Sequence, residues 1–121
     1  MSHRLSRNFM KSEFACSCCG EAEVDSNLVY NLQKLRDAFG LPIHITSGYR
    51  CEVHNKAIGG AKNSKHLQGK AVDIRTHHLP GTEKHKLMTL IFRMNTFTGV
   101  GVGGNKLHVD VRDSDPVLWF Y

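Results

Sequence analysis

Two stretches of the chain each carry a histidine and an aspartate. The first is Ser64-Lys-His-Leu-Gln-Gly-Lys-Ala-Val-Asp73, in which a glycine-containing turn separates His66 from Asp73 by seven residues. If residues 71–75 form a strand, its two β-branched residues point to one face of the sheet and Asp73 points to the other. An imidazole and a carboxylate placed in this way can converge on one cation.

The second stretch is Lys106-Leu-His-Val-Asp-Val-Arg112. As a strand it would place its apolar residues in the core, with His108 and Asp110 on the opposite face. His66, Asp73 and His108 then form a set of three ligands that leaves a fourth tetrahedral position free for water. This arrangement is typical of a catalytic zinc site rather than a structural one.

These motifs occur in a specific order along the chain. The pattern Ser64-x-His66-x-x-Gly69-x-Ala71-x-Asp73 is preceded by Ser47-Gly-Tyr-Arg-Cys51 and followed by His108-Val109. The ordered set resembles the zinc-dependent peptidoglycan peptidases of the M15 type, and the similarity runs from about Phe14 to the C-terminus. This family includes D-alanyl-D-alanine carboxypeptidases and L,D-endopeptidases and shares its fold with the Hedgehog signalling domain.

The resemblance implies a fold class and a metal. The expected fold is α+β, with a small, mainly antiparallel sheet and helices packed on one face, as in the Hedgehog and D,D-peptidase proteins. The expected cofactor is Zn²⁺, held by His66, Asp73 and His108. These three ligands agree with the set that the two predicted strands bring together.

The resemblance also implies roles for Arg50 and Ser64. Arg50 would point into the cleft as a catalytic and substrate-binding residue, where its guanidinium holds a substrate carboxylate or the developing oxyanion. The alternative is a surface arginine paired with Glu52. Ser64 would bind substrate or brace the site, and the alternative is an ordinary turn hydroxyl.

The general base is where this chain departs from the family pattern. Relatives commonly carry an acidic residue or a histidine three positions before the last ligand, and this chain has Asn105 there. An amide cannot accept and return a proton, so we take Asp110 as the catalytic base. Asp110 could equally orient a ligand from behind or form a plain ion pair with Arg112.

The sequence therefore predicts a zinc peptidase that hydrolyses peptide bonds in peptidoglycan stem peptides. Either an endopeptidase or a D,D-carboxypeptidase is expected, acting in cell-wall lysis or remodelling. The asparagine at position 105 leaves one alternative open, which is a non-catalytic, metal-containing module that binds the cell wall.

The composition narrows the class of partner. The 121 residues suffice for a single domain, and 40% hydrophobic with 22% charged residues indicates a globular chain without a membrane span. The net charge of +5 favours anionic partners, but no helix-turn-helix signal or aromatic-interleaved basic stretch indicates nucleic acid. We expect a monomer that acts on peptidoglycan.

The first ten residues carry basic side chains but no apolar segment and no small-residue cleavage site, unlike a secretory signal. We therefore expect synthesis in the cytoplasm and action on the wall, in the periplasm, after release. A phage or prophage endolysin fits this expectation.

Cysteine usage leaves three alternatives. Cys16-Ser-Cys-Cys19 precedes Gly20 in a segment, residues 1–23, for which we expect irregular structure, and Cys51 is the remaining cysteine. The cluster lacks the paired Cys-x2-Cys motifs of structural zinc sites, and cytoplasmic synthesis disfavours a disulfide. Reduced buried thiols, a pairing of Cys51 with the cluster, and a second zinc site all stay open.

The other predicted elements position these motifs. The first half of the chain should form a helix capped by Asp25 or Ser26 and ended by Gly40, a half-buried strand at 43–46, and a short helical turn ending at 59–60. A loop at 76–81, a second helix capped by Thr82, a glycine-rich strand from Phe97 and a hairpin turn at 103–105 should follow. We expect the aromatic end at 119–121 to seal a core edge, and the alternative is an exposed platform for sugar rings.

Overall fold

The computed structural model describes residues 3–121 and shows an α+β fold organised around one sheet. The strands lie in the order β3 (Ile45–Ser47), β4 (Ala71–Arg75), β6 (Lys106–Asp110), β5 (Gly99–Val102) and β7 (Val117–Phe120). Neighbouring strands are antiparallel except for β5 and β7, which are parallel. The predicted fold class is confirmed.

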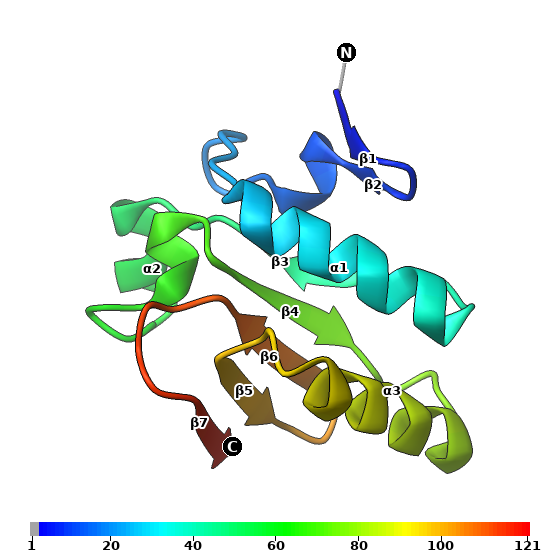
Figure 1. Cartoon of the computed structure of the whole chain (residues 1–121). Coiled ribbons are helices and arrows are strands. Elements are labelled where there is room, and N and C mark those ends of the chain that lie inside the picture. The colour runs from blue at the N-terminus through cyan, green and yellow to red at the C-terminus, as the bar shows by residue number, and fades with distance from the viewer. Residues whose placement is uncertain (1–2) are drawn as a thin grey trace.

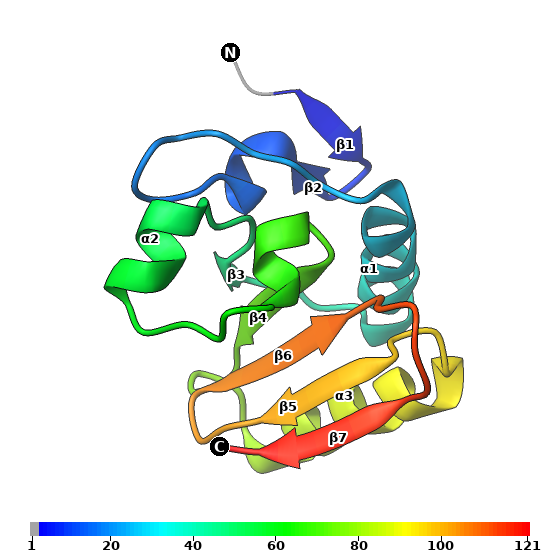
Figure 2. The ribbon, with the colours of Figure 1, turned by 90° about the vertical axis from the view of Figure 1, so that its left-hand side faces the viewer.

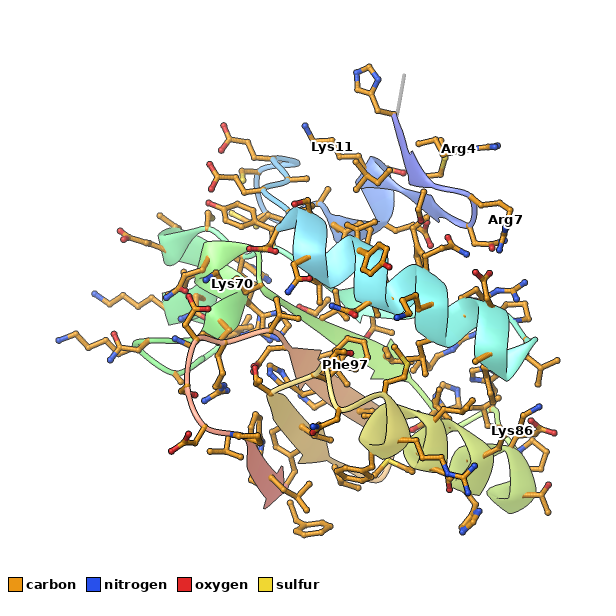
Figure 3. All side chains as sticks on the ribbon, viewed as in Figure 1. Arg4, Arg7, Lys11, Lys70, Lys86 and Phe97 are labelled. Atoms are coloured by element: carbon orange, nitrogen blue, oxygen red, sulfur yellow. The ribbon has the colours of Figure 1, made fainter. Side chains whose placement is uncertain are left out.

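Two long helices cover one face of the sheet. They are α1 (Ser26–Phe39) and α3 (Gly81–Met94), which contact each other in front of the strands in Figure 1. Figure 2 shows β6, β5 and β7 side by side with α3 behind them. Phe97, labelled in Figure 3, follows α3 and is buried in one hydrophobic cluster with residues of both helices and of the sheet. This arrangement leaves the other face of the sheet for the polar side chains of β4 and β6.

Helix α1 forms as the sequence predicts. The carboxylate of Asp25 accepts hydrogen bonds from the backbone of Asn27 at 2.8 Å and Leu28 at 3.3 Å, so it is the N-cap. Gly40 ends the helix in the left-handed region, with φ at 80°. The apolar residues of the helix recur every three or four positions and are buried against the sheet: Leu28, Leu32, Leu35 and Phe39.

Helix α3 begins one residue earlier than its predicted cap. Pro80 is the N-cap, and its carbonyl accepts from the backbone N–H groups of Glu83 and Lys84 at 3.0 Å each. Thr82 therefore lies inside the first turn, and the prediction that it caps the helix is wrong. The apolar stripe is confirmed, since Leu87 and Ile91 are buried.

The alternation on β4 and β6 separates the core from the polar face. Val72 lies opposite Val109 in the register, and both side chains are fully buried in the cluster under the helices. Asp73 lies opposite His108 in the same register and points to the other face. Register and alternation thus place two of the predicted ligands side by side.

The N-terminal segment is more regular than expected. Within its described part, residues 3–23, β1 (Arg4–Ser6) pairs antiparallel with β2 (Phe9–Met10), and the 3-10 helix η1 (Lys11–Phe14) follows. The basic side chains Arg4, Arg7 and Lys11 lie on this part of the molecule in Figure 3. Strands of two and three residues are too short to show a hydrophobic period, so the prediction of irregular structure is wrong for residues 4–14. It is confirmed for residues 15–23, which form no helix or strand.

The C-terminal strand lies at the sheet edge and does not seal the core. Phe120 is 73% exposed and Tyr121 is 64% exposed, so that prediction is wrong for these two residues. The strand predicted at 43–46 begins at Ile45, while α2 (Glu52–Ala57) and the β5–β6 hairpin lie where they were predicted. None of the helices in residues 3–121 has the length and apolar composition to cross a membrane.

Candidate metal centre

His66 is held in one tautomer. It lies in the short 3-10 helix η2 (Lys65–Gln68), where its backbone N–H donates to Ser64 Oγ at 3.2 Å. Its Nδ1 is 2.7 Å from the carbonyl oxygen of Gly48, and a carbonyl only accepts, so Nδ1 carries the proton. Its Nε2 therefore has a free lone pair. That atom is buried and has no hydrogen-bond partner among the residues described.

The carboxylate of Asp73 contacts two histidines through one oxygen and two cations through the other. Its Oδ1 is 3.3 Å from His66 Nε2 and 3.2 Å from His108 Nδ1. Its Oδ2 is 3.5 Å from Arg50 Nη2 and 3.6 Å from Lys106 Nζ. Burial acts to raise the pKa of Asp73, but the contacts with His108, His66 and Lys106 outweigh it and hold the pKa well below its ordinary value.

A hydrogen bond to Asp110 orients the ring of His108. His108 Nε2 is 2.7 Å from Asp110 Oδ2, so Nε2–H donates to the carboxylate and Nδ1 is left as an acceptor facing Asp73. Burial acts to lower the pKa of His108, but the hydrogen bond to Asp110 and the negative charge of the nearby Asp73 outweigh it and raise the pKa.

Both oxygens of Asp110 are occupied and the residue is fully buried. Besides His108, the carboxylate accepts from Arg112, whose Nη2 is 2.7 Å from Oδ2 and whose Nε is 2.9 Å from Oδ1. Burial acts to raise the pKa of Asp110, but the hydrogen bonds from Arg112 and His108 lower it well below its ordinary value. Among the roles that the sequence left open, this geometry favours the orienting role over that of the general base.

The three predicted ligand atoms fit a tetrahedral ion. His66 Nε2, Asp73 Oδ1 and His108 Nδ1 belong to residues whose ligand atoms all lie within 4.8 Å of one another. Atoms that stand 2.0–2.1 Å from a tetrahedral zinc are about 3.3 Å apart. The two nitrogen–oxygen distances given above, 3.3 and 3.2 Å, match that edge. The unpartnered lone pair of His66 and this donor set are what a zinc ion requires.

Ligands His66 and His108 open onto a cleft of about 710 Å³. Of the described residues that line it, none is acidic, and its cations are Arg50, Lys62, Lys65, Lys106 and Arg112. Two aromatic side chains complete the wall: Trp119, whose ring centroid is 5.0 Å from that of His108, and Tyr121, whose ring lies 4.4 Å from Lys106 Nζ. The cleft is therefore suited to an anionic ligand.

The sequence analysis did not place Lys106 in the cleft, and it offered a ligand-binding role for Trp119 and Tyr121 only as an alternative, as a platform for sugar rings. Lys106 lies two positions before His108 on the same strand, so the period of two could have placed it on the same face. Trp119 and Tyr121 had no comparable signal, because their position depends on the parallel pairing of β7 with β5.

The alternating glycines of β5 make room for the site. A Cβ atom at Gly99 would lie 2.3 Å from both carboxylate oxygens of Asp110, and one at Gly101 would lie 2.5 Å from Trp119 Nε1. Larger residues at these positions would displace the carboxylate or the indole. The predicted strand is confirmed, and its glycines allow Asp110 and Trp119 to reach the histidines from the neighbouring strands.

Arg50 and Ser64 both line the cleft. Arg50 Nη1 donates to Asn55 Oδ1 at 3.1 Å, and its side chain is only 11% exposed, so it is not a surface arginine paired with Glu52. Ser64 caps the helix that carries His66, which agrees with a bracing role. Asn105 is exposed in the turn before β6 and is not among the described lining residues.

Two comparisons with known proteins agree with this site. Residues 7–112 match the family model described as Peptidase M15. The zinc D-Ala-D-Ala carboxypeptidase of Streptomyces albus G is 32% identical over 95 residues, which cover 75% of this chain and 36% of that protein. The chain thus spans little more than a third of the length of this curated relative.

Proposed function

This chain belongs to the peptidase M15 family, and on that premise we propose that it is a zinc peptidase that cleaves peptide bonds in the stem peptides of peptidoglycan. The observation that carries the proposal is the convergence of His66 Nε2, Asp73 Oδ1 and His108 Nδ1 beside a basic cleft. Similarity to a zinc D-Ala-D-Ala carboxypeptidase supports both the metal and the substrate class.

The proposed roles follow from the contacts. A zinc ion held by His66, Asp73 and His108 would activate water and polarise the scissile carbonyl group. The Gly48 carbonyl holds the His66 tautomer, and Asp110 holds the His108 tautomer, so both imidazoles present a lone pair to the same point. The ligands are thus oriented before the metal binds.

The cations of the cleft would bind the substrate. Peptidoglycan stem peptides end in carboxylates, and the guanidinium of Arg50 lies 3.5 Å from the Asp73 carboxylate at the centre of the site. A substrate carboxylate or the developing oxyanion can take a donor from this group. Lys106, whose Nζ lies 3.6 Å from the same Asp73 oxygen, adds a second positive charge. Either an endopeptidase or a D,D-carboxypeptidase would use these contacts.

A second candidate function is a metal-containing module that binds the cell wall without cutting it. The observation in its favour is that none of the described residues lining the cleft is acidic, and that Asn105 stands where relatives commonly have an acidic residue. Such a module would keep the zinc ligands and the basic cleft but would lack a group that moves the proton.

Incubation with purified peptidoglycan separates the two candidates. The peptidase predicts new free amino groups in the soluble or insoluble fraction, and mass spectrometry of the muropeptides identifies the bond that is cut. The His66→Ala variant serves as the control, because it removes a ligand whose ring lies inside the site. Sedimentation of the protein with the wall, without new termini, would instead establish the binding module.

A further inference from the structure

A second group of metal-type ligands lies outside the catalytic cleft. The loop that carries Cys16, Cys18 and Cys19 lies beside the N-terminus of α2, where Cys51 is the N-cap (Figures 1 and 2). Within residues 3–121 all four cysteines are free thiols. The sulfurs of Cys16, Cys19 and Cys51 all lie within 4.8 Å of one another.

The spacing of two of these sulfurs matches a metal site better than a disulfide. Cys16 Sγ is 3.7 Å from Cys51 Sγ. Two thiolates bound 2.3 Å from a tetrahedral zinc stand about 3.8 Å apart, whereas bonded sulfurs are about 2.0 Å apart. The group therefore has the edge length of a zinc–thiolate tetrahedron.

Backbone amides point at the sulfurs and stabilise negative charge on them. The N–H of Cys51 donates to Cys16 Sγ at 3.5 Å, and the N–H of His54 donates to Cys51 Sγ at 3.4 Å. Thiolates that bind metals also accept hydrogen bonds from backbone amides in this way.

The loop is shaped to present its sulfurs together. The N–H of Gly20 donates to the Cys16 carbonyl at 2.8 Å, and the N–H of Cys16 donates to the Glu21 carbonyl at 2.7 Å. Gly20 adopts φ of 77°, which closes the turn at low cost only for glycine. Cys16 and Cys19 thus form one Cys-x2-Cys pair on a tight turn, and Cys51 faces them from another segment.

We propose that Cys16, Cys19 and Cys51 bind a second zinc ion through their three thiolates. This ion lies outside the catalytic cleft and has a structural role, and its binding releases the thiol protons to solvent. The ion ties residues 16–19 to the residue that follows Arg50.

The proposed zinc site would support the segment that orients His66 in the catalytic centre. A Cβ atom at Gly48 would lie 2.6 Å from Phe14 Cα, and Tyr49 N–H donates to the Phe14 carbonyl at 2.8 Å. The segment between Phe14 and Cys16 is therefore packed against the segment whose Gly48 carbonyl orients His66. A metal at the cysteines would fix both ends of this contact.

The test uses metal content and spectroscopy rather than activity. Protein purified in the presence of a thiol reductant should carry about two zinc ions per chain, and the cobalt-substituted protein should show a thiolate-to-cobalt charge-transfer band. The His66→Ala variant should retain that band, because its catalytic ligands contain no sulfur. Cys19→Ser, at an exposed position, should weaken the band and lower the zinc content toward about one.

The unsubstituted protein provides a second measurement that does not depend on the folding of any variant. A mercurial that binds thiols should release about one zinc ion from the wild type, detected with a chromogenic chelator. The proposal is overturned if the reduced wild type carries zinc but shows no thiolate band with cobalt. It is also overturned if the mercurial releases no zinc, or if the cysteines are joined in a disulfide.

Discussion

The substitution Asp110→Asn tests how the structure orients a ligand. In the wild type the carboxylate accepts from His108 Nε2 at 2.7 Å and from Arg112 Nη2 and Nε at 2.7 and 2.9 Å. Asparagine has nearly the same shape but offers only one oxygen. The His108 Nε2–H and the Arg112 guanidinium both donate, and the side-chain nitrogen of asparagine also only donates. In Asp110→Asn this nitrogen must therefore face at least one of these donors without a hydrogen bond.

The magnitude follows from the hydrogen bond that is lost. If the amide nitrogen faces His108, the imidazole either loses its partner or shifts its proton to Nδ1, which removes the lone pair that faces Asp73. A hydrogen bond to a charged group contributes about 1.5–3 kcal/mol. At about 1.4 kcal/mol per factor of ten, zinc affinity should fall by about 10- to 100-fold.

The assay is peptide hydrolysis by chelator-treated Asp110→Asn protein across a zinc titration. We expect activity to return when zinc is supplied in excess, since Asp110 acts through His108. Asp115→Asn, an exposed aspartate on the C-terminal segment, is the matched control and should titrate like the wild type. If the rate stays lower by about 10²- to 10⁴-fold at saturating zinc, Asp110 is the general base and our reading of its contacts is incorrect.

Further substitutions test the packing around the site and the core. Gly99→Ala should weaken zinc binding and lower stability by about 1–3 kcal/mol, because the added Cβ would lie 2.3 Å from both Asp110 oxygens; an unchanged melting temperature and zinc affinity would contradict this. Asp25→Ala should lower the free energy of unfolding in urea by about 1 kcal/mol, whereas serine at the same position should retain most of it; equal losses would count against the capping role. Leu32→Ala should lower the free energy of unfolding by about 2–5 kcal/mol in the same measurement. A loss below about 1 kcal/mol would show that Leu32 is not packed in the core as described. Arg50→Lys should lower kcat/KM by about a hundredfold with zinc affinity retained, and an unaltered kcat/KM would remove Arg50 from substrate binding.

The strands that carry the ligands could be predicted from the sequence because a half-buried strand has a period of two. Val72 and Val109 face the core, so Asp73 and His108 must face the other way. A hairpin turn between 103 and 105 then made β5 and β6 neighbours. The pairing of β4 with β6, which aligns the two ligands, carries no local signal and was not predicted from the sequence.

Other features could not be predicted because they depend on contacts between distant segments. Gly99 and Gly101 indicated a strand, but the carboxylate and indole that need their space come from β6 and β7. The convergence of Cys51 with the loop at 16–19 spans about a quarter of the chain and has no periodicity. The sequence offered His108 or Arg112 as alternative partners for Asp110, and the structure shows that the carboxylate contacts both.

The central claim is that His66, Asp73 and His108 hold the zinc ion on which hydrolysis depends. The most direct measurement is the rate at which chelator-treated protein releases free amino groups from purified peptidoglycan as zinc is added back, compared between the wild type and His66→Ala. If these residues hold the catalytic zinc, the wild-type rate should rise from near zero to a plateau as zinc is added. Folded His66→Ala should stay inactive at every zinc concentration. A full rate without zinc, or wild-type activity in His66→Ala, would contradict it.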